Sequence, residues 1–313
     1  MTFETNIILQ RLVVPGVCSL IGCVLLARTD QGEDWFEDEP VRGVGIQTLF
    51  GAFLCGIGFI ASDFWFRGII EKPAEWQNWR ASYQWNWLVW TIPAAMMVLA
   101  LTRVCFATPI QYVSIATTLM WSMSIGILFV SLNEGEVWMD QSAKLMPWLA
   151  AGAIAIALNT LSFNAIAKSG GSRWNCLVAL AQLGCVAAIA MQAYGTLGEL
   201  AIAGAAVAAI ASFVAMVKPS TSKTHFGWQL STIVLPLTIL AVSILTVSRF
   251  FEAVQLPTWL LASVLFLPTL AGTADLVFGR LSNVWFRPIF AGAVCAGVFG
   301  WVLNLALSKT PDW

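Results

Sequence analysis

Long apolar stretches, separated by short polar connections, are the feature that most constrains how this chain can fold. Of its 313 residues, 58% are hydrophobic and only 11% are charged, whereas soluble domains carry roughly 25% charged residues. About ten stretches are long enough to cross a bilayer, which takes about 20 apolar residues each. The sequence therefore predicts an all-α, polytopic membrane helix bundle. We expect residues 1–313 to form a single integral membrane domain, with possible halves at 1–144 and 145–313.

The apolar stretches are unevenly composed, and this suggests where the centre of the bundle lies. The predicted spans are residues 7–27, 43–66, 85–106, 112–132, 145–167, 176–194, 197–217, 230–247, 259–278 and 289–307. Those between 145 and 217 are rich in Gly, Ala and Ser, and in lipid such small residues let helix backbones approach closely. We therefore expect this block to form the centre. Gly292, Ala296 and Gly300 recur every four residues in the last span and predict another packing face.

The polar segment after the second span has a helical period. Aromatic residues fall on one face of a predicted helix at about 73–84 and at its junction with the next span, namely Trp76, Trp79, Tyr83 and Trp87. Trp and Tyr concentrate in the headgroup layer of membranes. The pattern favours a short interfacial helix that anchors the chain at the membrane surface. An aromatic ligand-binding face is the alternative.

Several kinds of chemistry are excluded or disfavoured by the residue inventory. The chain has one histidine, His225, so a H-E-x-x-H zinc site and multi-histidine metal sites are impossible. There is no G-x-x-x-x-G-K-[ST] nucleotide loop. The seven cysteines fall in or beside apolar segments, where they are typical small apolar residues. The acidic segment 28–42 lacks calcium-loop spacing. We therefore expect no metal and no cofactor.

A few amides stand out inside the predicted spans. The candidate substrate-binding residues are Asn159, Asn164, Gln182 and Asn304. Amides in lipid must find partners or face a water-filled cavity. The plainer interpretation is interhelical bonding, worth about 0.6–2 kcal/mol per bond. We expect Asn159 and Gln182 to reach similar depth and line one cavity, with Asn164 at its mouth or in helix packing. Because no strong charge is expected in mid-span, a neutral or zwitterionic substrate is favoured.

One enzymatic alternative is open. Residues 272–275 (Gly-Thr-Ala-Asp) resemble the G-x-G-D motif of intramembrane aspartyl proteases, with Ala274 in place of the second glycine. The resemblance implies Asp275 as one catalytic carboxylate and makes Asp63 a candidate for the other, since two carboxylates that share a proton can activate water. Arg67 follows Asp63 at i+4, however, and this spacing favours an ion pair.

The function that these features favour is a small-molecule transporter or permease in the cell membrane. A membrane scaffold or accessory subunit without transport activity is the alternative, and the aspartyl protease is a third hypothesis. The lipid bilayer is the expected partner, together with a homo-oligomer or a membrane partner. The net charge of −1 gives no reason to expect nucleic acid. Lys and Arg in the loops from the third onward place the odd-numbered loops in the cytoplasm and both termini outside.

This arrangement predicts the sidedness of two loops. Cysteines engineered at Lys223 and Glu136, in a chain without native cysteines, should react with impermeant reagents from opposite sides of the membrane, with position 223 cytoplasmic. Labelling of both positions from one side would contradict the number of spans between them. A swap of sides would contradict the orientation.

Overall fold

The helices that the sequence predicts are formed throughout the described part of the chain. The computed structural model describes residues 9–29, 42–66, 86–105, 117, 121, 137–170, 172–193, 195–217, 231–250, 257–279 and 287–308. Every regular element among them is a helix, so this part of the chain is all-α, as predicted. The predicted interfacial helix at 73–84 lies outside the described residues, as does most of the predicted span at 112–132. The described part of the latter is Thr117 and Trp121.

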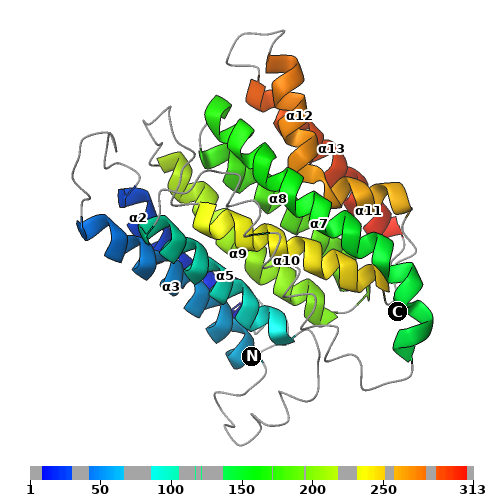
Figure 1. Ribbon diagram of the computed structural model, residues 1–313, viewed down its shortest axis with the longest axis horizontal. Coiled ribbons are helices and arrows are strands. Elements are labelled where there is room, and N and C mark those ends of the chain that lie inside the picture. The colour runs from blue at the N-terminus through cyan, green and yellow to red at the C-terminus, as the bar shows by residue number, and fades with distance from the viewer. Residues whose placement is uncertain are drawn as a thin grey trace, which may run out of the picture.

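The helices follow one another in the order that hydropathy predicts (Figure 1). They are η1 (Leu9–Val13, a π-helix), α2 (Val14–Thr29), α3 (Arg42–Phe66), α5 (Asn86–Cys105), α7 (Val137–Gly170), α8 (Ser172–Ala193), α9 (Gly195–Val217), α10 (Ser231–Phe250), α11 (Thr258–Leu265), α12 (Leu267–Gly279) and α13 (Arg287–Ser308). Each predicted span other than 112–132 coincides with one of these helices or with the α11–α12 pair.

Several helices suit a membrane by length and composition. Among the described residues, the segments long and apolar enough to cross one are Leu9–Leu26, Ile46–Asp63, Arg173–Gln192 and Gly195–Val217. The α11–α12 pair passes the same test jointly, across a bend of 70°. Shorter apolar helices cover Leu88–Thr102, Pro147–Phe163, Thr232–Ser248 and Ile289–Leu305. This part of the chain therefore has the helices of a membrane protein.

Helix α7 is longer than predicted at its start. The sequence places a polar loop at 133–144, whereas the helix already begins at Val137. The polar residues there lowered the local hydropathy, but residues 141–146 (Gln-Ser-Ala-Lys-Leu-Met) are mostly strong helix formers. Polarity marks where a segment leaves lipid, and it does not by itself end a helix.

The centre of the bundle is α10. Its residues from Thr232 to Ser248 are all buried, and Figure 1 shows the helix running between α5 on one side and α7 and α8 on the other. The predicted central block corresponds to α7, α8 and α9, of which α8 and α9 pack extensively on each other. We predicted that the helices rich in small residues would form the centre, whereas the most buried helix is α10, which packs against them. The small residues allow this packing, because a Cβ on Gly204 of α9 would lie 2.7 Å from the Leu240 side chain of α10.

Helices α2 and α3 approach each other through paired glycines. A Cβ on Gly22 would lie 2.6 Å from the Gly51 carbonyl oxygen, and one on Gly51 would lie 2.8 Å from that of Gly22. Both obstacles are backbone atoms, which cannot move aside as a flexible side chain can. The two helices are therefore held at a separation that only glycine permits at these positions.

The small-residue face predicted in the last span is open. Ala296 and Gly300 are exposed, and among the described residues no atom outside the adjoining turns of α13 lies within 4 Å of a Cβ placed on Gly292 or Gly300. Helix α13 instead packs through another face, which includes Ala291, Cys295 and Val302. The spacing predicted close packing that the described part of the chain does not use.

The glycine pair gives a matched test of helix packing. Gly22→Ala should lower the free energy of unfolding by about 1–3 kcal/mol, because the methyl group meets backbone. Gly292→Ala should be neutral or raise it by about 0.5–1 kcal/mol, since alanine favours a helix and the position is open. Thermal unfolding of both variants in detergent measures the difference. Equal stabilities would show that α2 and α3 do not approach as described.

Candidate functional site

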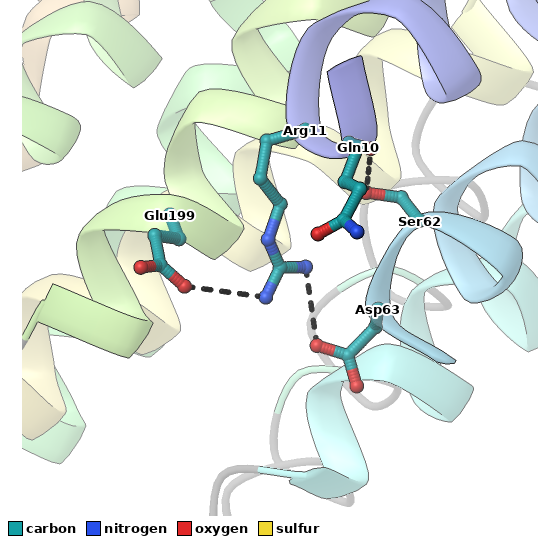
Figure 2. Close-up of polar contacts among 5 residues, drawn as sticks. All are labelled: Gln10, Arg11, Ser62, Asp63 and Glu199. Atoms are coloured by element: carbon teal, nitrogen blue, oxygen red, sulfur yellow. Dashed lines mark hydrogen bonds and ion pairs between the residues drawn. The ribbon is translucent and has the colours of Figure 1, made fainter. Parts of the chain in front are cut away.

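A charged cluster lies inside the bundle where η1, α3 and α9 meet. The Arg11 guanidinium donates to Asp63 Oδ1 from Nη1 at 3.1 Å and to Glu199 Oε2 from Nη2 at 3.4 Å. Figure 2 shows Arg11 reaching between the two carboxylates, which come from separate helices. The residues are 1%, 0% and 7% exposed, respectively. One cation thus joins two acids that are distant in the sequence.

The local structure explains how the cluster is positioned. Arg11 belongs to the π-helical turn η1, and such turns are frequent at functional sites. The preceding residue, Gln10, accepts a hydrogen bond on its carbonyl from Ser62 Oγ at 2.7 Å (Figure 2). Ser62 is the neighbour of Asp63, so one short segment of α3 holds both the backbone and the guanidinium of η1. Glu199 is near the start of α9 and completes the cluster.

The sequence did not predict this cluster. No strong charge was expected in mid-span, and Arg11, Asp63 and Glu199 lie near the ends of their predicted spans. Asp63 pairs with Arg11, whereas its predicted partner Arg67 lies outside the described residues, so that pair stays a prediction. A single charge near a span end can be explained by the membrane surface. Nothing in the sequence therefore indicated that Arg11 and Glu199 form a pair. The available signal was that Arg11, Asp63 and Glu199 each interrupt an otherwise apolar predicted span.

The electrostatics of the cluster favour a structural tie. A charge taken from water into a low-dielectric interior is costly unless it is paired and hydrogen-bonded. Arginine stays charged at any physiological pH, and its planar fork can hold two carboxylates at once. The Arg11 side chain therefore draws η1, α3 and α9 together at one place in the bundle.

A second polar cluster surrounds the break between α11 and α12. The bend of 70° falls at Phe266, and Pro268 follows it. Proline has no N–H, so the Val264 carbonyl has no intrahelical donor at i+4. Thr269 N would be the helical donor to the Leu265 carbonyl, since Thr269 is at i+4. It donates instead to Asn159 Oδ1, at 3.2 Å. The Leu265 carbonyl therefore needs another donor, and the Val264 carbonyl, which accepts a backbone N–H at the end of α11, can accept a second bond.

The amides Asn159 and Gln182 supply those donors. Asn159 Nδ2 donates to Leu265 O at 3.1 Å, and Gln182 Nε2 donates to Val264 O at 3.1 Å and to Leu265 O at 3.3 Å. Thr269 Oγ1 also donates to Asn159 Oδ1, at 2.7 Å. Both amides are 0% exposed. The prediction that Asn159 and Gln182 reach similar depth is confirmed, because they share an acceptor.

The other predicted site residues lie elsewhere. Asn304 is exposed on α13. Asn164 belongs to α7, but its side chain lies outside the described part, like that of Trp87 in α5 and all of Trp76, Trp79 and Tyr83. The structure thus joins two of the four predicted amides and adds a break that the sequence analysis did not foresee. Pro268 was the signal for that break.

The structure does not bring Asp63 and Asp275 together. Asp63 is in the charged cluster on α3, and Asp275 is buried on α12. Figure 1 shows these two helices on opposite sides of the bundle. Gly272 has a packing explanation, since a Cβ there would lie 2.7 Å from Ser162 Cβ of α7. The dyad that an aspartyl protease requires is therefore not formed.

Neither the arrangement of metal-ligating residues in the described ranges nor comparison with known proteins indicates a function. Within the described ranges, no group of three or more His, Cys, Asp or Glu residues is arranged to hold a metal ion. Comparison with protein-family models, curated proteins and solved structures finds no match to this chain. The candidate site therefore depends on its geometry alone.

The charged cluster predicts an asymmetric response to substitution. Arg11→Met should lower the free energy of unfolding by about 3–5 kcal/mol, because two buried carboxylates lose their shared cation. Adding Glu199→Gln to that variant should restore part of the loss. The exposed Arg173, whose guanidinium lies 5.9 Å from the Trp174 ring centroid, is the control. Arg173→Met should cost no more than about 1 kcal/mol.

Thermal unfolding in detergent measures all three variants. Equal losses for Arg11→Met and Arg173→Met would show that the cluster does not stabilise the bundle. A further loss on adding Glu199→Gln would show that Glu199 depends on a partner other than Arg11.

Proposed function

We propose that this chain is a multi-pass carrier of small molecules in the cell membrane, with about ten spans and a substrate site at the α11–α12 break. The supporting observation is the break itself, which lies inside an apolar pair of helices and is surrounded by buried amides. Non-helical backbone at membrane depth is tolerated where protein buries it or where it lines a cavity. Transporters commonly bind substrates and ions at such discontinuous helices.

The two amides have different roles in this proposal. Asn159 Oδ1 already accepts from Thr269 N and Oγ1, and its Nδ2 donates to Leu265 O. Asn159 therefore fixes the geometry of the break. Gln182 uses its Nε2 on the α11 carbonyls and has its oxygen left for another group. Gln182 is the better candidate for direct contact with the substrate.

The substrate class follows from the groups at the break. The hydrogen bonds there are made by amides, carbonyls and a hydroxyl group. The charged cluster is carried by other helices, η1, α3 and α9. A neutral or zwitterionic small molecule suits such a site better than a multiply charged one, since burying an unpaired charge is costly.

Uptake and stability measured on the same variants test the proposal. Gln182→Ala should reduce uptake of neutral or zwitterionic solutes into proteoliposomes at least about tenfold, equivalent to about 1.4 kcal/mol, with a small change in melting temperature. Asn159→Ala should reduce both, because it removes the bonds to Thr269 and Leu265. Asn164→Ala should have a smaller effect. Asn304→Ala, at an exposed position, is the control.

The rival interpretation is that both amides only join helices. It predicts that uptake by the Gln182 and Asn159 variants falls in proportion to their melting temperatures. That result would remove the proposed site. Absence of uptake by the unaltered chain across the solute panel would favour the scaffold or accessory subunit instead.

A further inference from the structure

One atom at the break has no hydrogen-bonding partner. Gln182 is 0% exposed, and within the described part of the chain its Oε1 accepts no hydrogen bond. The Nε2 contacts with the α11 carbonyls determine which way the amide faces, so exchanging its oxygen and nitrogen would lose both bonds. A buried acceptor without a donor is uncommon in proteins and requires an explanation, such as a functional role, an ion or water.

The remaining hydrogen-bonding capacity at the break is mostly for acceptance. A carbonyl oxygen has two lone pairs, and an amide nitrogen has two N–H groups. Leu265 O and Asn159 Oδ1 each accept two bonds, and Val264 O accepts one from Gln182 and one from a backbone N–H at the end of α11. What is left is the Gln182 oxygen, with two lone pairs, and one N–H of Asn159. Acceptors therefore exceed donors.

The end of α11 contributes in the same direction, and at the start of α12, where the partial charge is opposite, the Thr269 and Leu270 N–H groups are already bonded. Helix α11 ends at Leu265, and the carboxyl end of a helix carries a partial negative charge from its unpaired carbonyls. The Gln182 oxygen lies on the residue that binds those carbonyls. A group with N–H or O–H donors suits this environment, whereas a group that offers only acceptors does not.

We propose that the break recognises a ligand through an N–H or O–H donor that bonds to Gln182 Oε1. This inference rests on the proposed function, since it names the chemistry of the substrate group that the carrier would hold at this point. Amines, primary amides and alcohols meet the requirement. Fully N- or O-alkylated analogues of the same charge do not.

Paired probes test the requirement for a donor without knowledge of the natural substrate. The pairs are acetamide with N,N-dimethylacetamide, ethylene glycol with 1,2-dimethoxyethane, and methylammonium with tetramethylammonium. Within each pair the charge is the same and the donors are removed by methylation. The full chain in detergent is heated with each probe, and sodium and potassium chloride at equal ionic strength report any cation binding.

We expect the donor member of at least one pair to raise the melting temperature by about 2 °C relative to its methylated partner. The difference should vanish in Gln182→Met and persist in the control Asn304→Leu. Gln182→Glu, which retains an acceptor oxygen, should keep the preference and serves if Gln182→Met does not fold. The pair that responds identifies an amide, alcohol or ammonium donor.

Three results would overturn the inference: equal shifts within every pair, a preference that survives Gln182→Met, or stabilisation by sodium ions alone. The first would assign the Gln182 oxygen to water. Failure of the carrier proposal is distinguishable, because donor-dependent stabilisation without uptake would leave a binding site that does not transport. Uptake without donor preference would contradict the present inference and leave the carrier in place.

Discussion

Backbone hydrogen bonding is the constraint on which this structure depends most. In lipid no water is available to replace a missing partner, so each carbonyl must be satisfied by the protein. Helices meet this requirement for themselves everywhere except at their ends and at proline. The α11–α12 break leaves the Leu265 carbonyl without a helical partner, and Asn159 of α7 and Gln182 of α8 both donate to it. Gln182 also donates to the Val264 carbonyl, which accepts a backbone N–H as well.

Close packing provides the rigid frame that positions these groups. The small residues of α2, α3, α8 and α9 let backbones approach, and α10 fills the middle with branched side chains. A polar contact such as that of Asn159 with Leu265 joins residues 106 apart in the sequence. It is maintained because the helices that carry them have little freedom to shift. Helix packing sets where the polar groups lie, and the hydrogen bonds of the amides set how they are oriented.

The sequence predicted the elements of this fold better than their relations. Hydropathy located the spans because burial in lipid leaves a strong local signal. Asn159 and Gln182 were identifiable because an amide in an apolar run has few explanations. The Arg11–Glu199 pair was not, since its partners are 188 residues apart and no local pattern links them. The start of α7 was not predicted, because the polarity of a segment indicates whether it lies in lipid or water and does not determine whether its backbone is helical.

The order of synthesis limits the order in which the contacts of the charged cluster can form. Arg11 leaves the ribosome first, and Asp63 follows after one further helix, so a hairpin of α2 and α3 can form that contact early. Glu199 emerges on the order of ten seconds later at typical rates of roughly 5–20 residues per second. Its arrival adds a second acid to a guanidinium already engaged by α3. The complete cluster can therefore form only after the α2–α3 hairpin and the later α9 have met.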